Sequence, residues 1–264
     1  MSSETSTVQP TNALPGAISS INAALTVAHR ELLSLFISPM AYIILFVFLL
    51  VNGATYRFYI IALQGEMEPV LASQFGGIPF WFLWLLVPAL VTMRSFAEER
   101  RTGTFELLVT SGVSDFSVVL GKFLAAWLFV SFLWAAVLIL ILVSSFYGNL
   151  DWGIVGSLYF GLAVSSLLLT AMGVLASSFT QNQLIAAILA VSANLGLFFF
   201  HYLRVLIPPG SIEHRFFEYV SPLYHFGSDF SRGVIDLRTS ILYVTLSGAL
   251  LFGAVKVLER RRWT

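Results

Sequence analysis

The side chains best suited to chemistry in this 264-residue chain are four histidines, and they are scattered along it. No His-Glu-x-x-His zinc motif occurs, and no pair of aspartates lies within an apolar stretch. Isolated histidines of this kind are typical of structural or interfacial positions, so the sequence predicts no metal site and no catalytic centre. The four are His29, His201, His214 and His225.

A glycine–lysine pair, Gly121-Lys122, is the nearest approach to a phosphate-binding loop. Its spacing from Gly112 is wrong, and Phe123 follows where the loop needs Ser or Thr. We therefore expect no nucleotide site in this chain. Lys122 instead suits a snorkelling anchor at the foot of an apolar span.

The amino-acid composition indicates that the protein lies in a membrane. Hydrophobic residues make up 58% of the chain and charged residues 11%, against about 25% charged in soluble domains. The net charge of +0 gives no electrostatic case for nucleic acid, and the absence of cysteine excludes disulfides and thiolate chemistry. The apolar runs are about 20 residues long, which fits membrane helices and not barrel strands.

Six such runs predict an all-α integral membrane protein. Trp81 and Trp84 lie near one end of the second run, where aromatic belts are found. The predicted spans are Met40–Ile61, Phe80–Met93 (extended back to Gly76), Val118–Val143, Ile154–Phe179, Leu184–Ile207 and Ser240–Leu258.

Two segments precede the first span. Residues 1–17 are polar and predict a disordered cytoplasmic tail, with residues 18–264 forming the transmembrane domain. From Ile18, apolar residues recur at three- and four-residue steps until Ser38-Pro39, which predicts an amphipathic helix in the membrane interface.

The distribution of basic residues favours a cytoplasmic location for both termini. With the N-terminus inside, the inner segments hold nine basic residues and the outer segments five. The inner set is Arg30, Arg94, Arg100, Arg101, Lys122, Lys256, Arg260, Arg261 and Arg262, and the outer set is Arg57, Arg204, Arg215, Arg232 and Arg238.

The cytoplasmic connection between the second and third spans carries helix signals. Ser95 and Glu98 have the spacing of a capping box. Thr104 is a candidate cap for a short helix over Phe105–Thr110, and Ser114 for the following helix. The short helix would expose apolar side chains beside Glu106, which suits either contact with lipid or contact with a partner protein.

A longer pattern in this connection resembles the cytoplasmic signature of ABC-2 type transporter permeases. The resemblance covers the chain from Ile18 to its end and includes the order of elements. It implies that the short helix is a coupling helix that docks into a separate ATPase subunit, which would bind ATP and Mg while this chain binds no cofactor. The pattern reads Glu98-Glu99-Arg100-Arg101-Thr102-Gly103-Thr104-Phe105-Glu106-Leu107-Leu108 and continues to Gly121-Lys122.

The same resemblance implies which residues meet the ATPase. The side chains of the coupling helix would enter the ATPase, and the four charged residues before it would form polar contacts around the dock. Their other interpretation is a set of interfacial charges facing water and headgroups. The docking set is Glu98, Glu99, Arg100, Arg101, Thr104, Phe105, Glu106, Leu107 and Leu108.

The outer loop before the last span resembles that of the gliding-motility-associated (GldF-like) branch of these permeases. This implies short helices that dip into the outer leaflet, broken at Pro222 and stopped at Gly233. An ordinary amphipathic loop would select similar residues. The motif residues are Pro222, His225, Phe226, Phe230, Arg232, Gly233, Asp236 and Arg238, and Phe216, Phe217, Val220, Phe226 and Phe230 would form the apolar side.

Within the spans, ionisable groups are almost absent, which argues against an ion-coupled carrier. Asn194 in the fifth span suits a hydrogen bond between helices. Small residues such as Gly161 and Gly173 give the fourth span a face for close packing, within the subunit or across a dimer.

The resemblance therefore implies the permease subunit of an ABC exporter in a bacterial inner membrane, paired with an ATPase and a second permease, identical or related. The alternative is a membrane anchor or force-transmitting scaffold without transport. Sequence indicates neither the substrate nor the direction of transport.

Overall fold

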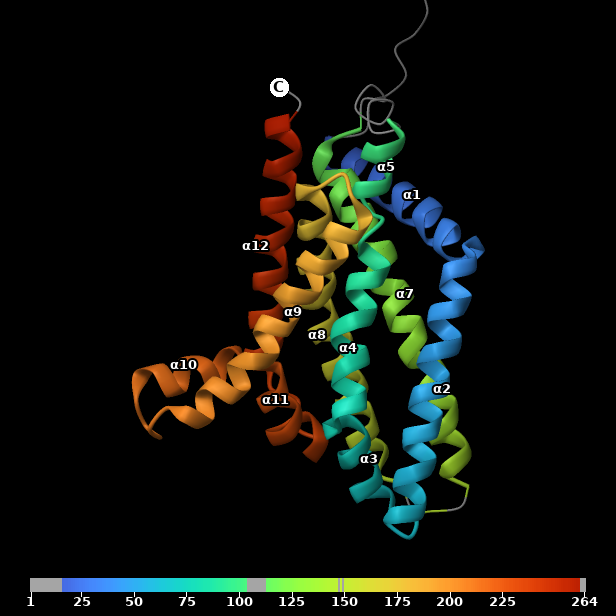
Figure 1. Ribbon diagram of the computed structural model, residues 1–264, viewed down its shortest axis with the longest axis vertical. Helices are drawn as coiled ribbons and strands as arrows, with labels where there is room; N and C mark the ends of the chain where they lie inside the picture. Colours follow the sequence, from blue (N-terminus) through green and yellow to red (C-terminus); the bar gives the residue numbers. More distant parts are fainter. Residues whose placement is uncertain (1–15, 104–112, 147, 149, 262–264) are drawn as a thin grey trace, which may run out of the picture.

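The computed structural model describes residues 16–103, 113–146, 148 and 150–261, and these residues form helices and no strands (Figure 1). Six helices in this part of the chain are long and apolar enough to cross a membrane. They are α2 (Pro39–Ala62), α4 (Ile78–Thr92) continued to Thr102, α7 (Asp115–Ser144), α8 (Trp152–Phe179), α9 (Gln183–Leu206) and α12 (Leu237–Arg261). The prediction of an all-α membrane protein with six spans is confirmed.

Shorter helices lie at the two ends of this bundle. At the end that carries the C-terminus are α1 (Gly16–Ile37) and α5 (Ala97–Thr102), and at the other end is α3 (Met67–Gly76) (Figure 1). Between α9 and α12 are α10 (Ile212–Val220), α11 (Pro222–Ser228) and the 3₁₀ turn η1 (Phe230–Arg232). The predicted tail lies almost wholly outside the described residues, and so does the predicted coupling helix.

The amphipathic helix α1 ends at Ile37, directly before Ser38 and Pro39, as the sequence predicts. It packs along the start of α7, and Gly121 makes the contact possible. A Cβ on Gly121 would lie 2.7 Å from the carbonyl oxygen of Ala24. The small face of α1 is therefore directed at α7, while its larger side chains such as Ile21 and Leu25 stay exposed.

The second span does not extend back to Gly76, because the chain breaks there into α3 and α4. Gly77 between them is extended (φ −74°, ψ 151°), and the helix resumes at Ile78. A Cβ at Gly77 would lie 2.6 Å from the Tyr59 hydroxyl oxygen and 2.9 Å from a backbone oxygen of α3. The break places α3 across the end of the bundle, and glycine is the residue that fits this tight site.

Trp81 and Trp84 are not part of an aromatic belt. Both are buried, at 3% and 1% exposed, because α4 is surrounded by other helices. Trp84 contacts Trp134 of α7 at 5.0 Å between ring centroids, and Trp81 contacts Phe226 of α11 at 5.5 Å. Aromatic side chains on this span form the core of the protein.

The small face of α8 packs within the subunit. Gly161 receives Phe230, whose ring carbon would lie 2.6 Å from a Cβ at that position, and Gly173 packs against Thr92 of α4. Asn194 of α9 donates a hydrogen bond to the carbonyl oxygen of Leu85 at 3.0 Å, as predicted for a contact between helices. These contacts position α8 at the centre of the bundle.

The outer segment is also partly a core element. Pro222 begins α11 and Gly233, with φ +79°, follows η1, so the predicted break and stop are confirmed. Phe226 and Phe230 are buried in the protein and do not face lipid, whereas Phe216 is exposed. The predicted apolar side is therefore divided between the protein core and the surface.

Candidate functional site

The short helix α5 leads from α4 towards the signature segment, and its first turn is held by α8. The Ser177 Oγ atom accepts hydrogen bonds from the backbone N–H groups of Phe96 (3.0 Å) and Ala97 (3.2 Å). The first N–H groups of a helix have no partner within the helix, so an outside acceptor stabilises its start. Ser177 has no exposed surface, which makes this a dry and specific anchor.

The predicted capping box of Ser95 and Glu98 does not form. Helix α5 begins after Phe96, and no side chain of the cap residue itself makes a capping bond. The acceptor comes instead from a serine 81 residues further along the chain. Local spacing suggested a cap at this place, but a tertiary contact supplies it.

A second link joins α5 to the end of α8. The Arg100 guanidinium donates to the carbonyl oxygen of Ser178 at 2.6 Å. Carbonyl groups in the last turn of a helix lack partners and carry partial negative charge, so a guanidinium is a favourable partner. Arg100, one of the four charged residues in the signature, therefore makes a contact within the chain.

Lys122 forms the third link and is not a snorkelling anchor. Its side chain is only 2% exposed, and its Nζ atom lies 3.0 Å from a Glu31 carboxylate oxygen and 2.7 Å from one of Glu99. The Phe96 ring centroid is 5.4 Å from the same nitrogen. Because two carboxylates surround the ammonium, Lys122 connects α1, α5 and α7, and we call these three residues the Lys122 triad.

The start of α7 is fixed as the sequence predicts. Ser114 is the cap residue, and its Oγ atom accepts the backbone N–H of Ser117 at 3.2 Å. Ser117 in turn donates its hydroxyl to the carbonyl oxygen of Ser20 in α1 at 2.8 Å. The segment 104–112 therefore leaves from α5 and returns to α7 at two positions that are both anchored to neighbouring helices.

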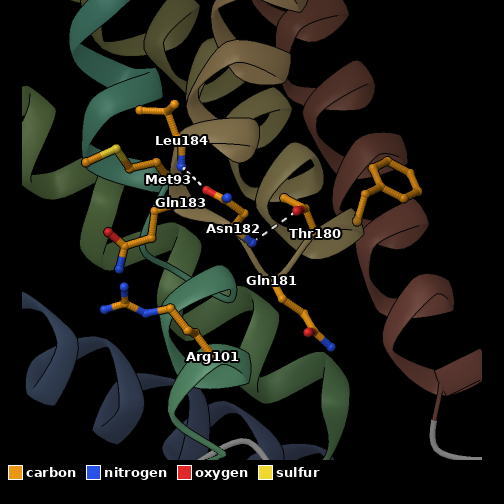
Figure 2. A pocket seen from close by; sticks show the side chains of 8 residues that line it. Met93, Arg101, Thr180, Gln181, Asn182, Gln183 and Leu184 are labelled. Carbon is orange, nitrogen blue, oxygen red and sulfur yellow. Dashed lines mark hydrogen bonds between the residues drawn. The ribbon is translucent and has the colours of Figure 1, made fainter.

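A hollow of about 760 Å³ lies beside α5, against the turn between α8 and α9. Figure 2 shows Arg101 reaching from α5 towards Gln183 at the start of α9. The turn is ordered by its own side chains, because the Asn182 Oδ1 atom accepts the N–H of Leu184 at 2.9 Å. Arg101 is exposed at the edge of the hollow, so this cation is available to a partner.

The predicted docking residues fall into three groups. Glu99 and Arg100 make contacts inside the chain, while Glu98 is partly exposed and Arg101 is exposed. The remaining ones lie outside the described residues: Thr104, Phe105, Glu106, Leu107 and Leu108. Ser177, Ser178 and the α8–α9 turn, which the sequence analysis did not single out, complete the site.

At the opposite end, the outer-loop motif is organised around His225. This side chain is 5% exposed, and its ring nitrogens lie 3.0 Å from the Tyr219 carbonyl oxygen and 3.3 Å from the Thr239 hydroxyl. An Asp229 carboxylate oxygen is 3.5 Å from Nδ1. The motif histidine thus joins α10, α11 and the start of α12.

The charged residues around His225 line a polar hollow of about 440 Å³. Arg238 lies over the Tyr219 ring at 4.8 Å from its centroid, and an Asp236 carboxylate oxygen caps the Arg238 N–H at 2.8 Å. A hydrogen bond to Glu218, together with partial burial, raises the pKa of the Tyr224 hydroxyl. Arg232 and Gly233, the other motif residues, are exposed.

The six long apolar helices among the described residues define a multi-pass membrane protein. Comparison with protein families makes this specific. The model of the ABC-2 family transporter protein matches residues 4–255, and the chain belongs to that family. It is thus a permease, the membrane subunit of an ABC transporter, and the family implies an ATPase partner and typically a dimeric arrangement. A search of curated proteins found no match.

Proposed function

We propose that this permease couples ATP hydrolysis by a separate ATPase subunit to the export of a substrate. The observation that carries the proposal is the anchoring of α5 to three other helices immediately before the predicted coupling helix. Ser177 holds its start, Arg100 holds its end to α8, and Lys122 holds its middle to α7 and α1.

The contacts that anchor α5 suggest how force from the ATPase would reach the membrane helices. An ATPase that moves the segment 104–112 pulls on α5 at one side and on the start of α7 at the other. Packed side chains and buried polar contacts resist independent motion, because each broken contact leaves a buried group without a partner. The movement would then reach α4, α7 and α8 together and tilt them as a group.

Docking would involve the segment itself and the surface beside it. The coupling helix over Phe105–Thr110 would enter the ATPase, and Arg101 with the α8–α9 turn would form a second contact. Glu98, Glu99 and Arg100 would act differently from one another: Glu98 is open to a partner, whereas Glu99 and Arg100 stabilise the support. ATP and Mg would bind in the partner chain.

The orientation that suits this mechanism puts both termini and α5 in the cytoplasm of a bacterial inner membrane. The described chain begins and ends at the same end of the bundle, which also holds α5 (Figure 1). Arg101 belongs to α5, and Lys256 lies near the end of α12. A basic cytoplasmic end agrees with the positive-inside rule. The outer motif around His225 supports placing the protein in the gliding-motility-associated branch, with a second permease, identical or related, completing the transporter.

The test is to purify the tagged full-length chain in mild detergent and identify the proteins bound to it. We expect an ABC ATPase in the wild-type sample and its loss in Phe105→Asp and Leu107→Asp. Phe146→Asp is the matched control, because Phe146 is an exposed phenylalanine at the opposite end, and it should retain the ATPase. Failure to recover an ATPase from folded wild-type protein would refute the proposal.

A second measurement separates a permease that is coupled to its ATPase from a passive membrane anchor. The purified complex is placed in lipid vesicles, and its ATPase rate is compared with that of the detached ATPase. Coupling predicts that the permease changes the rate and that Leu107→Asp abolishes this change. A complex that binds but leaves the rate unaltered would favour the membrane-anchor alternative.

A further inference from the structure

An apolar groove of about 500 Å³ runs between α2 and α4. Its walls are aliphatic and aromatic side chains, among them Ile43 and Val47 on α2 and Leu86 and Leu90 on α4. The groove lies within the two spans and opens towards the surroundings of the bundle, since Ile43 and Val47 are exposed. In a membrane-spanning protein such a surface meets hydrocarbon.

The length of the groove matches one leaflet of a bilayer. Its wall on α2 extends from Met40 to Phe48, which is about 12 Å along a helix at 1.5 Å per residue. Half of a hydrocarbon core is about 15 Å thick. One acyl chain that starts at the membrane surface would therefore fill it.

A cation stands at the surface end of this groove. Arg94 lines it, and the guanidinium donates to the Ser38 hydroxyl at 3.2 Å and to the Met40 sulfur at 3.0 Å. Thioether sulfur is a weak acceptor, and the buried Arg94 Nε atom has no hydrogen-bond partner in the described chain. No carboxylate of the described residues lies within the 4.0 Å of an ion pair with Arg94.

Two of the three carboxylates that line the hollow beside Arg94 are engaged elsewhere. Arg94 also borders a polar hollow of about 490 Å³ that contains the Lys122 triad, Ser34 and Ser95. Glu31 and Glu99 already surround Lys122, whereas the third carboxylate, Glu98, is partly exposed and forms no ion pair among the described residues. The polar hollow offers hydroxyl donors and space beside Arg94, while the apolar groove begins directly below it.

We infer that this groove binds a phospholipid of the leaflet at the α5 end, with one acyl chain between α2 and α4 and its phosphate on Arg94. Phosphate is the anionic group that a membrane supplies at this depth, and a guanidinium binds it with strong charge-assisted hydrogen bonds. The adjacent apolar and polar hollows match the two parts of such a molecule. The inference does not depend on the proposed coupling to an ATPase.

The experiment measures lipid binding to the detergent-purified full-length chain by native mass spectrometry. The probes are phosphatidylglycerol and diacylglycerol with identical acyl chains, which differ by the phosphate headgroup. We expect one phosphatidylglycerol per chain, bound at least about tenfold more tightly than diacylglycerol, as a lost charge-assisted hydrogen bond predicts. Arg94→Gln should lower the affinity for phosphatidylglycerol to that for diacylglycerol.

Two controls test whether the effect belongs to this site. Arg57→Gln removes a basic residue from the opposite end of α2 and should leave the preference intact. Equal binding of the two lipids to wild-type protein, or a preference that persists in Arg94→Gln, would overturn the inference.

Binding of the acyl chain in the apolar groove can be tested without changing Arg94. Leu86→Trp should fill it and weaken both lipids, whereas Phe252→Trp, at an exposed site on α12, should weaken neither. A Leu86→Trp protein that binds lipid as wild type does would refute the assignment of the acyl chain. The comparison of Leu86→Trp with Phe252→Trp tests the inference even if Arg94→Gln fails to fold.

A second copy of the chain is the competing occupant. Because the chain contains no cysteine, Val47→Cys introduces a single thiol in the groove. We expect this thiol not to cross-link two chains in membranes. Efficient cross-linking between copies at this position would show that protein covers the groove and would overturn the inference.

Discussion

Replacing Lys122 with Met leaves the Glu31 and Glu99 carboxylates facing an apolar side chain of similar length. Removing one partner of a buried ion pair costs about 3–5 kcal/mol, because an uncompensated charge stays behind. Here the carboxylates are 22% and 17% exposed, so water screens part of the loss. We therefore expect a cost near the lower limit, about 3 kcal/mol, or roughly a 150-fold change in the folding equilibrium.

The assay is thermal unfolding of the full-length protein in detergent, followed by tryptophan fluorescence. For a chain of this size, about 3 kcal/mol corresponds to a decrease of roughly 6–12 °C in Tm. Lys256→Met is the matched control. Lys256 also forms an ion pair, at 2.6 Å with Glu259, but both side chains are about half exposed, and such pairs contribute about 1 kcal/mol or less.

A triple variant separates buried charge from lost packing. Lys122→Met combined with Glu31→Gln and Glu99→Gln removes the whole Lys122 triad, and neutral replacement of complete buried ion pairs is often tolerated. We expect it to recover most of the lost stability. If Lys122→Met and Lys256→Met lower Tm equally, or if the triple variant is the least stable of all, the reasoning about the triad is refuted.

Two further substitutions test other contacts by the same unfolding assay. Ser177→Ala should cost about 2 kcal/mol, because two backbone N–H groups at the start of α5 lose their buried acceptor, whereas Ser145→Ala, at an exposed helix end, should cost much less. An equal loss for the two serines would contradict the anchoring of α5. Gly161→Ala should destabilise by about 1–3 kcal/mol, because the new methyl group would meet the Phe230 ring. Gly156→Ala on the same helix meets open space and should have little effect, and a similar loss there would argue for a general glycine effect.

The spans were predictable because their length is set by the bilayer. The first was predicted as Met40–Ile61 and is observed as Pro39–Ala62, and the fifth was predicted as Leu184–Ile207 and is observed as Gln183–Leu206. Local cap chemistry was equally readable at Ser114. Hydrophobicity and short-range spacing determine the spans and the cap, and both can be read from neighbouring residues in the sequence.

Contacts between distant segments were not predictable in the same way. Lys122 resembled a surface anchor because its partner Glu31 lies 91 residues away on another helix. The tryptophans of α4 are typical of a membrane–water interface, and only the packing of other helices around α4 shows that they are buried in the core. Gly76, Gly77 and Pro79 are a local signal for the break, but the close approach of the Tyr59 hydroxyl to Gly77 is not visible in consecutive residues. The GldF-like branch, the ATPase and the docking roles stay predictions.

The capping of α5 by Ser177 also has a consequence for biosynthesis. Phe96 leaves the ribosome 81 residues before Ser177, so the start of α5 has no native acceptor during that interval. At about 5–20 residues per second, the delay is roughly 4–16 s. The end of the protein that we expect to meet the ATPase is therefore completed only after α8 has been made, and a partner that recognises this end would distinguish finished permeases from nascent ones.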